Sequence, residues 1–174
     1  MIIWIASYPK SGNTWVRSFI TAYYFCENGI FDVNKLNLIQ DYPNKQFFKE
    51  TVKKGEIHKH WESSQKNICN EKKVKFLKTH NSLITAFGND FTKPVYSLGV
   101  IHIIRDPRNI ITSLKNHHDF ETYEKALTFM QDENKVLEDY PHLKNYAKTN
   151  IINSWRINYQ SWISNKNFRR LTIR

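Results

Sequence analysis

The sequence predicts an α/β fold in which a parallel sheet is flanked by helices. Short apolar runs, often β-branched, alternate along the chain with longer segments of helical periodicity. Such runs are typical of strands buried on both faces, as in parallel sheets whose crossover helices cover them. The chain has 174 residues, of which 40% are hydrophobic, so it can build one domain with a sizeable core.

The first half of the chain begins with a strand and a helix. Ile2 to Ala6 is a short apolar run, typical of a buried strand. The segment from Thr14 to Glu27 carries apolar residues at helical spacing, namely Val16, Phe19, Ile20 and Tyr23. Gly29 follows as a helix stop. From Val33 to Cys69 the periodicity is weak, which predicts short helices and loops.

The second half continues the alternation. Lys75 to Lys78 and Val100 to Ile104 are the next two expected strands. Asp106 followed by Pro107 is a strong helix start, because aspartate caps the helix and proline suits its first position. The helix that begins there is expected to end near His117. Two further helices are expected from Tyr123 to Glu138 and from Ile151 to Ser164, and a last strand from Phe168 to Ile173.

Composition narrows the class of protein. The net charge of +10 favours anionic partners, but no basic tract of five or more residues occurs, so nucleic acid is not the expected partner. No apolar run is long enough to span a membrane, and no signal peptide is evident. Cys26 and Cys69 have neither zinc-site spacing nor the number that a disulfide framework needs. We therefore expect free thiols, no metal site and a cytoplasmic location.

A possible anion site follows the first strand, in the stretch Pro9 to Thr14. A strand, a glycine-containing turn and a helix start leave unpaired N–H groups pointing outward, and the helix dipole adds positive charge. Lys10 contributes a full charge, and Gly12 allows close backbone approach. This arrangement resembles a P-loop, although the order Lys-Ser-Gly differs from the nucleoside-triphosphatase motif. From these letters alone, a simple turn with a solvated lysine remains an alternative.

Three segments together resemble sulfotransferases that use 3′-phosphoadenosine 5′-phosphosulfate (PAPS). Tyr8 to Trp15, YPKSGNTW, is similar to the family's phosphosulfate-binding loop, typically YPKSGTTW. Phe76 to Leu83, FLKTHNSL, resembles the segment that carries the catalytic histidine. Ile101 to His117 resembles the segment that binds the 3′-phosphate, which has an arginine before Pro and a serine further on. The resemblance covers essentially the whole chain and implies a P-loop nucleoside-triphosphatase-like sheet.

The resemblance implies roles for particular residues. Lys10 would bind the 5′-phosphate and stabilise the leaving oxygen, and His80 would remove the acceptor's proton as general base. Trp15 would stack on adenine, while Arg105 and Ser113 would hold the 3′-phosphate. The residues expected to bind the donor are Lys10, Ser11, Gly12, Asn13, Thr14, Trp15, Arg105 and Ser113. The acceptor would be a small molecule, a carbohydrate or a lipid with a hydroxyl or amine, and no metal is implied.

The sequence also departs from the family pattern. Asn13 replaces a threonine, and Asn81-Ser82 replaces the usual Leu-Pro after the histidine. Ile152 replaces a tyrosine that lies near the adenine in cytosolic members. The family's later Arg-Lys-Gly segment, which grips the 3′-phosphate, does not occur, so residues 1–174 are expected to form a single domain that is truncated at its C-terminus.

Two other function classes remain open at this level. A P-loop nucleotide kinase would use the same loop, but it needs Mg²⁺, and no carboxylate follows the expected strands, which end at Lys78 and just before Arg105. A non-catalytic module would bind nucleotide, or nucleic acid through charge alone, and a steep dependence of DNA affinity on salt would identify the latter.

Overall fold

The computed structural model describes residues 1–138 and 146–174. A five-stranded sheet lies at its centre, and every neighbouring pair of strands in it is parallel. In spatial order the strands are β2 (Gln40–Asp41), β3 (Lys75–Thr79), β1 (Ile2–Ser7), β6 (Ser97–Ile103) and β9 (Arg170–Ile173). The α/β prediction with a parallel sheet is therefore confirmed.

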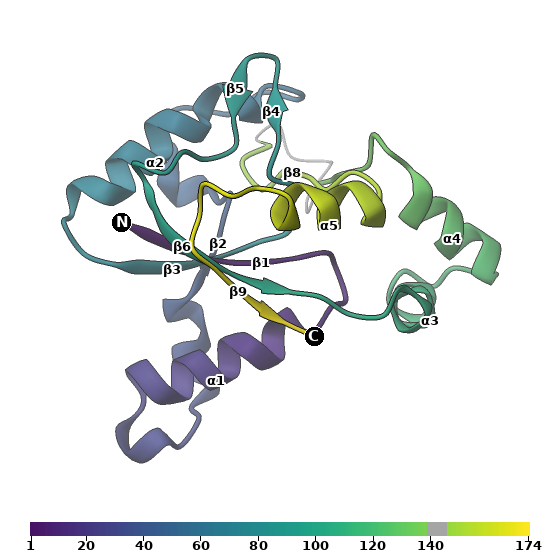
Figure 1. The fold of residues 1–174 in the computed structure, drawn as a ribbon, viewed down its shortest axis with the longest axis horizontal. Helices are drawn as coiled ribbons and strands as arrows, with labels where there is room; N and C mark the ends of the chain where they lie inside the picture. The colour runs from purple at the N-terminus through teal and green to yellow at the C-terminus, as the bar shows by residue number, and fades with distance from the viewer. Residues whose placement is uncertain (139–145) are drawn as a thin grey trace.

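Helices cover the sheet on both faces (Figure 1). Helix α1 lies on one face, and α2 and α5 lie on the other, with α3 and α4 beyond the carboxyl end of β6. The α-helices are α1 (Asn13–Phe25), α2 (Trp61–Asn70), α3 (Pro107–His117), α4 (Tyr123–Gln131) and α5 (Trp155–Ile163). Short 3₁₀ helices span Glu27–Gly29, Val33–Leu38, Lys45–Phe47 and Ile57–His60. Two small antiparallel pairs join β4 (Thr85–Ala86) to β5 (Asn89–Asp90), and β7 (Val136–Leu137) to β8 (Asn150–Ile151).

The order of the strands fixes where a ligand can bind. From the central β1 the chain first builds β2 and β3 on one side, and then β6 and β9 on the other. Ala6 is in register with Thr79 of β3 and with His102 of β6, so the three strands end at the same level. In an open parallel sheet, ligands bind outside the carboxyl ends where the strand order reverses. The loops after β1, β3 and β6 meet at this place.

The two faces of β1 enter different parts of the core. Trp4 and Leu77 pack with Trp61, Phe91 and aromatic residues of neighbouring segments on the face that α2 and α5 cover. Ile5 points the other way and packs beneath α1, with Ile39 and Ile103. All of these side chains are almost completely buried. Burial on both faces explains why β1 is continuously apolar and lacks the alternation of a half-exposed strand.

The helix expected from Tyr123 to Glu138 is too long. The structure ends α4 at Gln131, and Val136–Leu137 pair with Asn150–Ile151 as β7 and β8. The side chain of Asp132 accepts a hydrogen bond from the backbone N–H of Asn134 at 2.9 Å. This local turn offers the backbone an alternative to the helix, as short polar side chains commonly do.

The helix expected from Ile151 to Ser164 also begins later. The hydroxyl of Ser154 accepts a hydrogen bond from the Ile157 N–H, which makes Ser154 the cap and starts α5 at Trp155. Within Val33 to Cys69 the expected short helices are present, together with the ten-residue α2 and the edge strand β2, which the sequence did not predict. A two-residue strand is too short for any alternation to reveal. Within the described residues, no helix is long and apolar enough to cross a membrane.

Candidate active site

The loop after β1 forms the floor of the site. Two of its residues have left-handed backbone conformations: Lys10 at φ 65° and Gly12 at φ 96°. Glycine adopts such angles without cost, whereas a lysine does so at a cost of about 1 kcal/mol. Gly12 caps α1, and its carbonyl accepts from the N–H of Val16 at 3.3 Å. The first N–H groups of α1, from Asn13 onward, have no partner inside the helix and point out of its N-terminus.

This loop opens into a cavity of about 570 Å³ at the carboxyl ends of β1, β3 and β6. Of the nine residues that the sequence singled out, eight line it: Lys10, Gly12, Asn13, Thr14, Trp15, His80, Arg105 and Ser113. The ninth, Ser11, is 6% exposed, and its hydroxyl has no hydrogen-bond partner among the described residues. An unpaired buried hydroxyl is costly in a folded protein, and a ligand oxygen in this loop would satisfy it. The fold thus brings the expected residues together.

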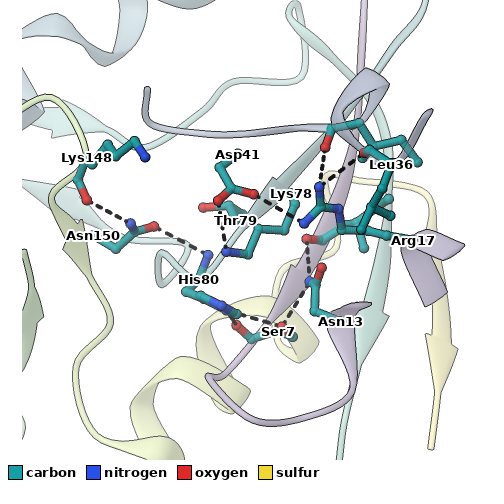
Figure 2. Close-up of polar contacts among 12 residues, drawn as sticks. Ser7, Asn13, Arg17, Leu36, Asp41, Lys78, Thr79, His80, Lys148 and Asn150 are labelled. Carbon is teal, nitrogen blue, oxygen red and sulfur yellow. Dashed lines mark hydrogen bonds and ion pairs between the residues drawn. The ribbon is translucent and has the colours of Figure 1, made fainter. Parts of the chain in front are cut away.

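His80 is held at the carboxyl end of β3 by three other elements, and Figure 2 shows its contacts with Ser7 and Asn150. Its backbone N–H donates to the side-chain oxygen of Asn150 at 3.4 Å, and its carbonyl accepts from the amide of Asn158 at 3.0 Å. Its ring nitrogen Nδ1 lies 2.8 Å from the carbonyl oxygen of Ser7. A carbonyl can only accept, so Nδ1 carries the proton and Nε2 keeps its lone pair.

The surroundings of His80 favour the neutral ring. Burial lowers its pKa from the ordinary 6.5 to about 3, and the charge of Lys78 acts in the same direction. The hydrogen bond to the Ser7 carbonyl opposes this shift, while Arg17 and Lys10 add further repulsion of a charged ring. A neutral imidazole with a fixed tautomer can accept a proton at Nε2, which a general base must do.

The side chain of Asn13 braces the loop against β1. Its side-chain amide donates to the carbonyl of Ile5 at 3.2 Å and to the hydroxyl of Ser7 at 3.0 Å. The same hydroxyl lies 3.3 Å from Nδ1 of His80. Asn13, which stands where the family typically has threonine, therefore links the start of α1 to β1 and to Ser7, the residue that fixes the His80 ring. Any contact of Asn13 with an anion would come from its backbone N–H.

Arg105 and Ser113 lie across the cavity from β3. Arg105 is exposed directly after β6, and its guanidinium donates to the carbonyl of Lys10 at 2.9 Å. This bond links the loop after β1 to the start of α3 and leaves further N–H groups of the guanidinium in the cavity. Asp106 caps α3 by accepting from the N–H of Arg108 at 2.9 Å, as expected from the sequence. Two turns into α3, Ser113 faces the same cavity.

Trp15 is not a core residue. Its side chain is 73% exposed at the rim of the cavity, with Phe19 one turn further along α1 at a ring-centroid distance of 6.5 Å. An exposed indole face beside an anion-binding loop can act as a stacking platform for a base.

The cavity wall also holds residues that the sequence analysis did not assign. They are Arg17, Lys78, His117, His118 and Glu138, with Pro9 and Leu137. Arg17 has a side chain that is only 12% exposed, although it lies on a helix of otherwise apolar pattern. A single arginine in a helix of apolar pattern, one turn after the anion loop, is the sequence signal that could have identified Arg17 as a cavity residue. His117 follows Ser113 by four residues on α3, a spacing that places both on one face.

The carboxylates, imidazoles and thiols of the described residues do not gather into a metal-binding group. A comparison with curated proteins found no match. A family model described as "Sulfotransferase domain" matches residues 2–173, which is nearly the whole chain. Together with the parallel sheet and the basic cavity at its carboxyl edge, this match shows that the chain belongs to the sulfotransferase family and is a sulfotransferase.

Proposed function

We propose that this sulfotransferase takes its sulfuryl group from PAPS and passes it to a hydroxyl or amine of a small molecule, carbohydrate or lipid. The acceptor oxygen or nitrogen attacks sulfur while the bond from sulfur to the 5′-phosphate oxygen breaks, and the electron pair of that bond stays on the phosphate. The acceptor's proton passes to the enzyme. The products are the sulfated acceptor and 3′-phosphoadenosine 5′-phosphate (PAP), and the proton then leaves to solvent.

The cationic cavity suits a donor with two phosphate groups. The N–H groups at the start of α1 and the hydroxyl of Ser11, which has no partner among the described residues, would hold the 5′-phosphate, and Lys10 would stabilise the charge on its leaving oxygen. Arg105 and Ser113, on the other wall, would hold the 3′-phosphate, for which a guanidinium offers two parallel N–H groups. Trp15 would stack on the adenine.

The observation that carries the mechanism is the fixed, neutral ring of His80. Its Nδ1 is occupied by the Ser7 carbonyl at 2.8 Å, so only Nε2 can take a proton. Because the phosphates have other partners, His80 is free to serve the acceptor. The protonated ring that forms during transfer would lie among cations, and the negative charge of the bound donor would offset that cost.

Ligand-induced thermal shifts test the donor assignment. PAP should raise the melting temperature more than ADP or AMP does, because only PAP presents a 3′-phosphate to Arg105 and Ser113. A ligand at one hundred times its dissociation constant adds about 2.7 kcal/mol to the free energy of unfolding. The Arg105→Ala variant should respond equally to PAP and AMP. Equal shifts for PAP and AMP in the unsubstituted protein would contradict the assignment of the 3′-phosphate site.

Transfer itself is measured with labelled PAPS and a panel of phenols, aliphatic alcohols, sugars and amines. Formation of PAP together with a labelled acceptor supports the proposal. Binding of PAP without transfer to any member of the panel or to water would favour a nucleotide-binding role without catalysis.

A further inference from the structure

The two residues that follow His80 hold a small pair of strands beside the cavity. Asn81 and Ser82 stand where the family typically has Leu-Pro, and both are completely buried. The side-chain oxygen of Asn81 accepts a hydrogen bond from the Ile151 N–H at 2.9 Å. The hydroxyl of Ser82 donates to the carbonyl of Ile152 at 2.7 Å. These bonds fix β8, which pairs with β7, so the departure from the family pattern positions both strands next to the base.

This pair of strands brings one carboxylate to the cavity. Leu137, at the end of β7, is in register with Asn150 of β8. The side chain of Asn150 in turn accepts from the backbone N–H of His80 at 3.4 Å (Figure 2). Glu138 follows Leu137 directly, is half-buried and lines the cavity. It is the only carboxylate among the described residues of the lining, and no hydrogen bond or ion pair engages it within residues 1–138 and 146–174.

The charge balance of the filled cavity makes this carboxylate unusual. The permanent cations of the described lining are Lys10, Arg17, Lys78 and Arg105. PAPS carries about four negative charges, two on the 3′-phosphate and two on the phosphosulfate, so a bound donor roughly matches these cations. Asp41, 3.4 Å from Arg17, adds a further negative charge. Once the donor is bound, the cavity therefore has no excess positive charge for Glu138, and a carboxylate without a counterion is costly away from water.

The wall around Glu138 is polar. His117 and His118 line the cavity with ring centroids 4.9 Å apart, and the ring of His118 is stacked on that of Phe120 at 5.3 Å. The apolar side chains of the described lining are few, namely Pro9, Trp15 and Leu137, and the indole would be taken up by the adenine. Such a wall offers little apolar surface to a lipid chain and suits a small polar acceptor.

We propose that Glu138 determines the acceptor specificity by binding an ammonium group, so that the acceptor is a small polar molecule with a positive charge besides its reacting hydroxyl. The hydroxyl would lie at Nε2 of His80 and the ammonium at Glu138. Because the donor brings negative charge into the cavity, donor and cationic acceptor strengthen each other's binding. This role rests on the proposed function, since it assumes bound PAPS and His80 as base, and it narrows the class of acceptor.

Two pairs of alcohols that differ in one positive charge test this role. Tyramine is compared with 4-ethylphenol, and choline with 3,3-dimethylbutan-1-ol, by transfer from labelled PAPS. In the native protein kcat/KM should be about 10-fold or more higher for the cation of a pair. Glu138→Gln should lower kcat/KM for the cation by about 10- to 100-fold and leave the neutral alcohol within a few-fold. A role of Glu138 in stability alone would lower both members equally. Glu138→Asp keeps the charge and should retain the preference.

Glu133→Gln is the matched control. The carboxylate of Glu133, five residues earlier in the chain, pairs with Arg156 at 3.2 Å and does not line this cavity, so its loss should leave the preference unchanged. Calorimetry adds a readout that needs no turnover: the complex with PAP should bind each cation more tightly than its neutral partner, and Glu138→Gln should abolish the difference.

Three results would overturn the role of Glu138. They are equal kcat/KM for both members of each pair in the native protein, equal losses for both in Glu138→Gln, and equal binding of both by the complex with PAP. Failure of the native protein to bind PAP, or to transfer the label to any acceptor, would instead count against the proposed function. In the second case the calorimetric comparison still decides whether Glu138 selects a cation.

Discussion

Replacing His80 with asparagine is the sharpest test of the mechanism. Asparagine carries its side-chain nitrogen close to the place of Nδ1, so it can still donate to the Ser7 carbonyl, which accepts from the ring at 2.8 Å in the native protein. It has nothing at the place of Nε2. The substitution therefore removes the base and keeps the hydrogen bond that orders the end of β3.

The expected effect is a loss of turnover with retained binding. General base catalysis contributes about 10²- to 10⁴-fold, so turnover should fall by that factor. The affinity for PAP should stay within a few-fold, because the phosphates would be held by the loop after β1 and by Arg105. An effect confined to turnover identifies an interaction made only in the transition state.

The pKa of His80 adds a measurable signature in stability. Its pKa in the folded protein is lowered to about 3 from 6.5, so the unfolded chain binds more protons between these values. The contribution of His80 to the free energy of unfolding is therefore fully present above pH 6.5, and it is lost as the pH falls toward 3. Between the unfolded pKa and about pH 5 the loss amounts to about 2 kcal/mol, and His80→Asn should abolish this part of the pH dependence.

Turnover, PAP affinity and urea unfolding at several pH values are measured in both proteins. His102→Asn is the control, because His102 is also a buried histidine with a lowered pKa but does not line the cavity. It should alter stability and leave the turnover of folded protein within a few-fold. If His80→Asn keeps most of its turnover, His80 is not the base. If turnover and affinity fall in proportion, the residue supports the phosphates and the base lies elsewhere.

Three further substitutions probe the remaining groups. Lys10→Met removes the charge beside the 5′-phosphate and keeps the length, so PAP affinity and turnover should both fall, turnover by about 10²-fold. Equilibrium binding and transfer assays check this, and unchanged rates would indicate that Lys10 is only a solvated residue of the turn. Arg105→Lys keeps the charge but loses the planar fork, so PAP affinity should drop by about 10-fold while AMP affinity stays constant in calorimetry. Asn13→Ala removes the donors to Ile5 and Ser7, and urea unfolding should report a loss of about 1–3 kcal/mol; a stability equal to that of the native protein would contradict the bracing role of Asn13.

Local sequence signals determined the outline of the fold. The continuous apolar run at Ile2 to Ala6 predicts a strand that is buried on both faces, and the structure places this strand at the centre of the sheet. Asp106 and Pro107 marked the start of α3 because capping depends only on neighbours in the chain. The end of α4 was missed because the side chain of Asp132 bonds to the backbone just after it, in a turn that competes with the helix. The start of α5 was missed because helical periodicity does not register the cap that Ser154 provides.

For the site, the resemblance of three short motifs to a known family selected eight of the residues that line the cavity, whereas Arg17 and Lys78 were not assigned. Lys10, His80 and Arg105 each follow a strand of the sheet, and parallel strands that are in register bring such residues to one edge. The resemblance to a family supplied their expected roles, because a lone lysine or histidine after a strand has no chemistry that spacing alone reveals.

Only the tertiary structure decided what surrounds those residues. Nothing in the sequence near His80 indicates that the Ser7 carbonyl holds its Nδ1, 73 residues away, or that burial and Lys78 lower its pKa. Asp41 lies in an edge strand of two residues without a pattern, yet pairing with β3 places it against Lys78. Tautomers, ion pairs and desolvation depend on distances between segments far apart in the chain. Such distances exist only after the chain has folded.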